Sequence, residues 1–182
     1  MMLNGTVTGL RAIERGDLPQ LLAWRNQPDF RRFFREHREL SIDQQTRWYE
    51  TAVLNDPGTR MFSVVERASG ALIGATGLCY IDPINRSADL SLYIGARGLY
   101  IDDVFAPDAA RTLIRYGFEE LSLHRIWAEI YSIDTAKQRL FECLGFVVDG
   151  RHREAHWTEG RWVDSLFYGL LEQTWQRQGQ RE

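Results

Sequence analysis

Cysteine and lysine are scarce in this chain of 182 residues, and each scarcity argues against a class of site. The two cysteines, Cys79 and Cys143, stand far apart without the spacing of a zinc site, which predicts free thiols in a reducing cytoplasm. Lys137 is the only lysine, and no run of basic residues forms a stripe. With a net charge of −3, the chain is not expected to have nucleic acid as its main partner.

Long apolar runs are also missing. No stretch of about 18 apolar residues predicts a membrane span, and the first residues lack the basic start and apolar core of a signal peptide. The composition, 44% hydrophobic and 26% charged, is that of an ordinary globular protein. We therefore expect one domain over residues 1–175 and a frayed polar tail over 176–182, in a protein of the cytoplasm.

Hydrophobic periodicity and capping residues predict a mixed α/β protein. Alternating apolar residues predict strands over 5–14, 59–67, 71–82, 86–95, 125–131, 146–157 and 161–171. Helical spacing predicts helices over 18–26, 42–54, 107–121 and 134–145. Ser41 and Asp134 are the expected N-caps of the second and fourth helices. A sheet with helices on both faces is the natural packing for this order of elements.

Several short segments carry a family resemblance. They are "LGF", "GRHRE" and "GRWVDSLFYGLL" in the C-terminal half, with "LLAWRN" and "QQTRWY" in the N-terminal half. In this order they resemble the GNAT superfamily of acyl-CoA N-acyltransferases, and within it the RimJ/RimL-type branch with its amino-sugar acetyltransferases. The resemblance implies a GNAT-type α/β fold. Its mixed, mostly antiparallel sheet would splay between the fourth and fifth strands and carry helices on both faces.

The resemblance also implies a site for acetyl-CoA as co-substrate. The pantetheine arm would lie in the splay and bond to the backbone of the fourth strand at Leu92, Tyr93 and Ile94. The loop before the third predicted helix would hold the diphosphate. The other positions implied for the co-substrate are Asp103, Val104, Phe105, Ala106, Asp134 and Lys137.

The loop at residues 101–106 departs from the family pattern Arg/Gln-x-x-Gly-x-Gly/Ala. Only Ala106 matches it, and Asp102 and Asp103 add two negative charges where a diphosphate is expected. Either this loop turns both carboxylates outward, or the site no longer holds a diphosphate there. A further departure is Phe141, which stands where the family usually has the tyrosine that protonates the leaving thiolate.

Two carboxylates are candidates for taking the proton of an amine substrate. Glu129, in "WAEIY", lies on the fifth strand beside the expected splay, where it could accept a proton directly or through water. Asp89 begins the fourth strand and could serve similarly, although a structural role is favoured. His152 and His156 share a strand face but lack a third strong ligand, so no metal site is expected.

A basic and aromatic cluster lies between the first two predicted helices. Arg31 and Arg35 are candidates to clamp an anionic part of the substrate, and Trp48 is a candidate to stack on a sugar or base. The alternative interpretation for the arginines is a solvated helix face.

The main hypothesis is an N-acetyltransferase for a small amine, such as an amino sugar or a peptide N-terminus, in a chain compatible with a homodimer. Two alternatives stay open. One is a GNAT scaffold that has lost the co-substrate and acts as a binding or regulatory module. The other is a cleft with different chemistry, in which Asp102, Asp103 and Asp134 hold a cation.

Overall fold

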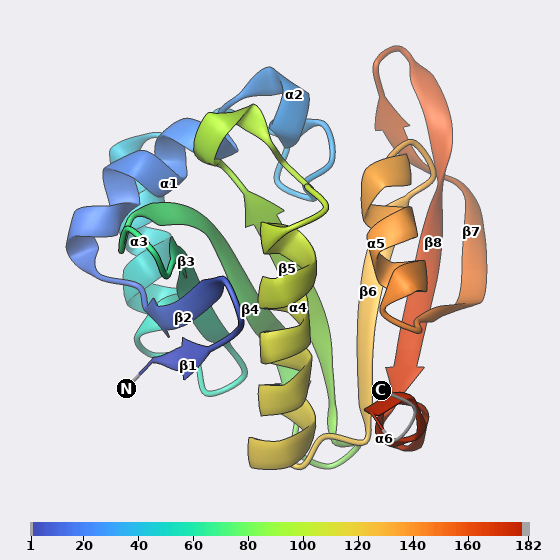
Figure 1. The fold of residues 1–182 in the computed structure, drawn as a ribbon. Helices are drawn as coiled ribbons and strands as arrows, with labels where there is room; N and C mark the ends of the chain where they lie inside the picture. Colours follow the sequence, from blue (N-terminus) through green and yellow to red (C-terminus); the bar gives the residue numbers. More distant parts are fainter. Residues whose placement is uncertain (1, 180–182) are drawn as a thin grey trace.

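The computed structural model, which describes residues 2–179, has one sheet of 8 strands with helices on both faces (Figure 1). The strand order is β1-β2-β3-β4-β5-β6-β8-β7. The strands are β1 (Leu3–Asn4), β2 (Thr8–Ala12), β3 (Arg60–Glu66), β4 (Leu72–Asp82), β5 (Ser87–Ile94), β6 (Arg125–Tyr131), β7 (Val147–Thr158) and β8 (Arg161–Leu171). The α-helices are α1 (Leu18–Arg25), α2 (Pro28–Arg31), α3 (Ile42–Trp48), α4 (Phe105–Arg115), α5 (Thr135–Cys143) and α6 (Glu172–Gly179).

The N-terminal strand predicted over residues 5–14 is shorter in the structure, where it is β2, and the unpredicted strand β1 precedes it and pairs with it antiparallel. The Asp108 carboxylate accepts hydrogen bonds from the backbone N–H groups of Thr6, Val7 and Thr8, at 2.8, 3.0 and 2.8 Å. The N–H groups of Thr6 and Val7 are bound to a side chain and not to a sheet ladder, so residues 5–7 form the turn between β1 and β2. Asp108 thereby anchors the N-terminal segment to the first turn of α4.

Several helices differ from the sequence-based expectation. α3 ends at Trp48 and α4 ends at Arg115, and a π-helical segment continues each of them, over Tyr49–Val53 and Tyr116–Glu120. α2 begins at Pro28, because proline suits the first turn of a helix as well as ending the previous one. α4 begins at Phe105 rather than at Pro107, because a side chain of the preceding loop accepts its first N–H groups. α6 extends through Gly179, into the tail that was expected to fray, and residues 180–182 lie outside the described residues.

The sheet opens between β5 and β6, which are the fourth and fifth of the predicted strands. Residues 87–89 pair with 125–127 in parallel, and beyond them the two strands separate (Figure 1). β5 continues along β4 to Ile94, while β6 continues along β8 to Tyr131, both antiparallel. The predicted fold class is therefore confirmed, including the splay between these two strands.

Each face of the sheet has its own apolar cluster. α4 and α5 cover one face, where Leu92, Leu113 and Phe141 are buried. The helices of the N-terminal half cover the other face, where Trp24 and Tyr93 are buried. Because successive residues of a strand point to opposite faces, Leu92 and Tyr93 enter different clusters. Burial on both faces thus fixes β5 in place although one of its edges is unpaired beside the splay.

Candidate active site

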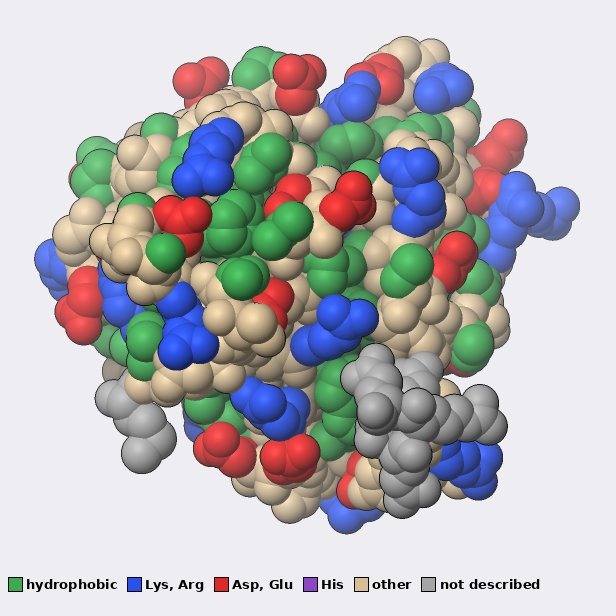
Figure 2. Space-filling view, viewed as in Figure 1, with side chains coloured by type: hydrophobic (Ala, Val, Ile, Leu, Met, Phe, Trp, Pro, Cys, Tyr) green, Lys and Arg blue, Asp and Glu red, His purple; other side chains and the backbone are tan. Residues whose placement is uncertain are grey.

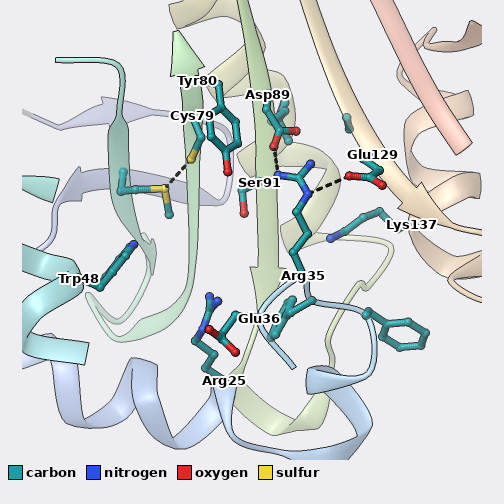
Figure 3. A pocket seen from close by; sticks show the side chains of 15 residues that line it. Arg25, Arg35, Glu36, Trp48, Cys79, Tyr80, Asp89, Ser91, Glu129 and Lys137 are labelled. Carbon is teal, nitrogen blue, oxygen red and sulfur yellow. Dashed lines mark hydrogen bonds and ion pairs between the residues drawn. The ribbon is translucent and has the colours of Figure 1, made fainter. Parts of the chain in front are cut away.

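A cavity of about 290 Å³ lies where β5 and β6 separate (Figure 3). Five of the residues predicted from the sequence line it, namely Arg35, Trp48, Asp89, Glu129 and Lys137. The other lining residues are Arg25, Phe33, Phe34, Glu36, Met61, Cys79, Tyr80, Leu90, Ser91 and Ala128. The cavity therefore combines residues from β4, β5, β6, α5 and the segments around α2 and α3.

Arg35 reaches between two carboxylates in this cavity (Figure 3). Its Nη1 lies 2.8 Å from Asp89 Oδ2, and its Nε lies 3.0 Å from Glu129 Oε2. Its guanidinium carbon lies 5.7 Å from the ring centroid of Tyr80 and 5.9 Å from that of Trp127. Two acids and two aromatic rings thus surround one organic cation. We call these four residues, Asp89, Glu129, Tyr80 and Trp127, the cation cage.

Strand geometry places the cation cage on one face of the sheet. Asp89 and Trp127 are partners in the parallel ladder, and Glu129 follows Trp127 by two residues, so the three side chains point the same way. Tyr80 has a φ of 51° at an irregularity in the pairing of β4 with β5. Its ring stacks on that of Trp127, with centroids 6.4 Å apart. The cage therefore exists only when β4, β5 and β6 are assembled.

The charges in the cage depend on one another. Burial raises the pKa of Asp89 above its ordinary value of 3.8, although the positive charge of Arg35 opposes this shift. Burial also disfavours the charge of Arg35, but Asp89 and Glu129 outweigh it and raise the pKa of Arg35. The Asp89 side chain is 6% exposed and that of Arg35 is 41% exposed. Removing the cation would leave a desolvated carboxylate without a counter-charge, so the cage favours a cation at neutral pH.

The structure does not bring together the two arginines predicted to clamp an anion. Arg31 lies 3.9 Å from Glu39 and is not among the residues that line the cavity. Arg35 has two carboxylate partners, which leave it little net charge to offer an anion. Trp48 does line the cavity, on the side away from Lys137 (Figure 3). The geometry around Arg35 is that of a cation site rather than an anion site.

A second polar group lies on the α5 side of the cavity. Asp134 caps α5 by accepting the backbone N–H of Lys137 at 3.0 Å, and it also accepts the Tyr100 hydroxyl at 2.5 Å. Lys137 Nζ lies 5.5 Å from the ring centroid of Tyr100. Burial lowers the pKa of Lys137 below its ordinary value of 10.5, while the charges of Asp134 and Asp89 oppose the shift. No sequence pattern identified Tyr100, because only the tertiary structure brings the loop after β5 to the start of α5.

Asp102 occupies the N-terminus of α4. Its carboxylate accepts hydrogen bonds from the backbone N–H groups of Val104, Phe105 and Ala106, at 3.0, 2.8 and 2.8 Å. These are the groups that an anion would use at a helix start. Asp103, in contrast, is exposed and accepts none of these three hydrogen bonds. Only one of the two carboxylates therefore binds the helix start, whereas both sequence-based interpretations of the loop treated the two carboxylates alike.

A groove of about 500 Å³ runs between α4 and α5 beside this helix start. Arg111 and Arg139 line it together with Asp102 and Asp103. Two arginines suit a diphosphate, and the edge of β5 that β6 leaves unpaired offers peptide groups to an extended arm. These features fit a CoA molecule, except that Asp102 already holds the N–H groups of α4.

The side chains predicted on the fourth strand divide between the two faces of the sheet. Leu92 and Ile94 are buried on the α4 side, and Tyr93 is buried on the other. Only their backbone groups can face the splay. Elsewhere, His156 stacks on the ring of Tyr131, whereas His152 is tilted by 52° against the ring of Phe167. The strand register shifts between the two histidines.

The surface over α4 and α5 carries charges of both signs. Figure 2 shows acidic and basic side chains interspersed on this face. Within residues 2–179, no helix has the length and apolar character needed to cross a membrane.

The fold and the cavity at the splay agree with the family that sequence comparison identifies. The family model for the acetyltransferase (GNAT) domain matches residues 8–147, and the chain belongs to this family. The protein is therefore an N-acetyltransferase, with acetyl-CoA as its co-substrate.

Individual relatives are named for amine substrates. The chain is 31% identical over 162 residues to the spermidine N(1)-acetyltransferase of Vibrio cholerae serotype O1, which covers 89% of this chain and 91% of the relative. A crystal structure of spermidine N-acetyltransferase from Vibrio cholerae with CoA and spermine has a TM-score of 0.86 at 27% identity, covering 94% of this chain and 99% of that one. The putative ribosomal N-acetyltransferase YdaF of Bacillus subtilis is 32% identical over 108 residues, 59% of this chain and 57% of the relative.

Proposed function

We propose that this protein N-acetylates a small cationic amine that carries a second cationic nitrogen, as polyamines do. The observation that carries the proposal is the cation cage, which holds the Arg35 guanidinium at the splay. An alkylammonium group has a positive charge and N–H donors, as a guanidinium does. Carboxylates and aromatic faces therefore attract both groups. An amine substrate can therefore take the position that Arg35 holds.

Two of the comparisons, both with Vibrio cholerae spermidine N-acetyltransferase, support this substrate class. The Vibrio cholerae protein is named a spermidine N(1)-acetyltransferase, and the solved structure from that organism contains CoA and spermine. Both amines are flexible and carry several positive charges, so one nitrogen can occupy the cage while another reacts. A neutral or singly charged amine lacks a second cationic nitrogen that could occupy the cage while the first one reacts.

Glu129 is the proposed acceptor of the amine proton, because an amine attacks a thioester only in its neutral form. Its Oε1 accepts a hydrogen bond from Ser165 Oγ, which fixes the carboxylate, and its Oε2 becomes free when Arg35 moves away. Asp89 is more deeply buried than Glu129. We assign Asp89 to holding the cation rather than to taking its proton.

The co-substrate is proposed to lie along the unpaired edge of β5 and in the groove between α4 and α5. It supplies the activated acetyl group. The backbone of residues 92–94 would bind the pantetheine arm, and Arg111 and Arg139 would face the diphosphate. The start of α4 would contribute its N–H groups once Asp102 has turned aside.

A panel of amines tests the proposal, with acetylated product measured by mass spectrometry. The panel contains spermidine, spermine, an amino sugar and a short peptide with a free N-terminus. We expect kcat/KM for the polyamines to exceed the others by at least about tenfold, or about 1.4 kcal/mol of transition-state stabilisation. Preference for the amino sugar or the peptide would overturn it, and preference for the peptide would favour the RimJ/RimL-type branch expected from the sequence.

We also propose that the protein self-associates, as the sequence-based expectation of a homodimer allows. One solved structure of the Vibrio cholerae spermidine N-acetyltransferase is described as dodecameric. Light scattering after size-exclusion chromatography gives the mass directly. A mass equal to that of one chain, 21.2 kDa, would contradict self-association.

A further inference from the structure

Lys137, the only lysine of the chain, points into the cavity from the first turn of α5 (Figure 3). Arg35 has two carboxylate partners, whereas no ion pair of Lys137 is found within residues 2–179. Its ammonium group is instead close to the face of Tyr100. A partly buried ammonium group without an acidic partner costs solvation energy, so its position calls for a function.

Acetyl transfer requires a proton on the leaving side of the reaction. A C–N bond forms between the amine and the acetyl carbon, and the C–S bond of the thioester breaks. The sulfur leaves with the electron pair and is stabilised by a proton donor. Phe141 lies one turn beyond Lys137 on the same side of α5 but has no proton to give.

Other ionisable groups near the splay are poor donors. Burial raises the pKa of Cys79 to about 11. Burial and the adjacent Asp134 raise the pKa of Tyr100 well above 10, and its hydroxyl already donates to Asp134. Arg35 does not release a proton in proteins. Lys137 alone among these groups combines a transferable proton with access to the cavity.

We propose that the Lys137 ammonium group donates its proton to the sulfur that leaves as the amine attacks. Glu129 takes one proton from the ammonium substrate before attack, the nitrogen releases a second proton to water as the C–N bond forms, and Lys137 gives one proton to the sulfur, so the products are an amide and a neutral thiol. Lys137 then regains a proton from water through the open side of the cavity, and Glu129 releases one. The proposal rests on acetyl transfer itself and not on which amine is the substrate.

The electrostatic surroundings support this role. Burial lowers the pKa of Lys137, which makes its ammonium group a stronger acid and a better donor near neutral pH. The charged or titratable groups around it come from several elements. They are Asp89 on β5, Glu129 on β6, Asp134 at the start of α5, Tyr100 on the loop after β5 and Arg35 on the segment after α2.

The first test measures Lys137 directly. Because the chain has one lysine, reductive methylation with ¹³C-formaldehyde gives a single side-chain NMR signal, distinct from that of the N-terminus. We expect CoA to shift its titration midpoint by more than about 0.5 pH units, since the ligand thiol would lie beside it, and desulfo-CoA to leave it unchanged. Equal responses to the two ligands would show that the sulfur does not contact Lys137, and would overturn the proposal.

The second test separates proton donation from charge. Lys137→Met and Lys137→Arg should both lower kcat at least about tenfold with KM changed less than about twofold, because arginine keeps the charge but not the transferable proton. The wild-type rate should fall as pH rises through the lowered pKa of Lys137, and this alkaline limb should vanish in Lys137→Met. Thr135→Ala, at the exposed start of α5, is the matched control and should keep wild-type kinetics.

Wild-type kcat in Lys137→Arg would overturn donation by Lys137. If Lys137→Met does not fold, the NMR experiment on the wild-type chain still decides the question. The substrate panel fails independently of these outcomes, because it compares amines, while the NMR experiment compares CoA with desulfo-CoA and needs no amine.

Discussion

Arg35 at the splay and Asp102 at the start of α4 each occupy a place where a ligand of the same charge is proposed to bind. A guanidinium lies where a cationic amine is proposed to bind, and a carboxylate lies where an anionic diphosphate is proposed to bind. Each side chain has the charge of the ligand and satisfies the groups that would recognise it. Each site is thus preassembled around a substitute from the same chain, and each ligand must displace that substitute.

The two substitutes differ in what their departure costs. Arg35 has a long side chain, 41% exposed, on a segment without regular structure between α2 and α3, so it can swing out by rotation of its own bonds. Asp102 has a short side chain that caps a helix, and its departure leaves three N–H groups without a partner until an anion arrives. We therefore expect the displacement of Asp102 by a diphosphate to cost more free energy than the displacement of Arg35 by an amine.

The largest expected effect comes from replacing Glu129, which pairs with Arg35 and is the proposed acceptor of the amine proton. Glu129→Gln should lower kcat/KM at neutral pH by more than about tenfold, because an amide accepts no proton. Circular dichroism should show an unchanged fold, since glutamine can still bond to Ser165. A pH–rate profile identical to that of the wild type would exclude Glu129 from proton transfer.

The next effect concerns Asp102. We expect the wild-type Kd for acetyl-CoA to exceed about 100 μM, and Asp102→Ser to lower it at least about tenfold, or about 1.4 kcal/mol, because serine caps the helix without a charge. The gain should shrink with added salt, as screening requires. Isothermal titration calorimetry at low and high salt measures the Kd of the wild type and of Asp102→Ser.

Asp103→Ser is the matched control for Asp102→Ser, since Asp103 is exposed and accepts none of the α4 N–H groups. Because Asp103 lines the same groove, its removal takes away one like charge, but the Kd should fall less than about threefold since no N–H group of α4 is freed. Low-micromolar binding by the wild type, or overlapping titrations for Asp102→Ser and the wild type, would refute the idea that Asp102 competes with the diphosphate.

A smaller effect is expected for Arg35. Arg35→Gln should lower KM for the amine about threefold to fivefold with kcat nearly unchanged, because the cage is freed of its internal cation. Arg38→Gln is the control, since Arg38 pairs with Glu36 and lies outside the cavity lining. A fall in kcat without a fall in KM would instead make Arg35 a residue that positions the two carboxylates.

The smallest effect on ligand binding is expected at Asp108, an acid on the first turn of α4 that serves the fold. Burial opposes its ionisation, but hydrogen bonds from Thr8, Thr6 and Val7 lower the pKa of Asp108 below its ordinary 3.8. A lowered carboxyl pKa contributes stability above the ordinary value, and this is lost as pH falls through the lowered one. Asp108→Asn should therefore unfold more easily at neutral pH, lose less stability below about pH 4 and bind CoA like the wild type. A wild-type melting profile across pH 2 to 7 would contradict this role.

The sheet and its helices follow largely from local features of the sequence. Alternating apolar residues placed β3 to β8, and helical spacing placed α1, α3 and α5. The boundaries at β1, β2 and α4 escaped this reasoning. Asp108 and Asp102 set them through hydrogen bonds that depend on how distant segments meet or how a loop folds back.

The candidate site shows the same division. The sequence by itself determined that Asp89, Glu129 and Lys137 lie beside a splay, because their strands and helix could be recognised from pattern and resemblance. Only the tertiary structure decided that Arg35 neutralises the two carboxylates, since charge pairing depends on distances of a few ångströms between segments far apart in the chain. The same holds for Asp102, whose direction depends on one side-chain rotation that no periodicity in a sequence encodes.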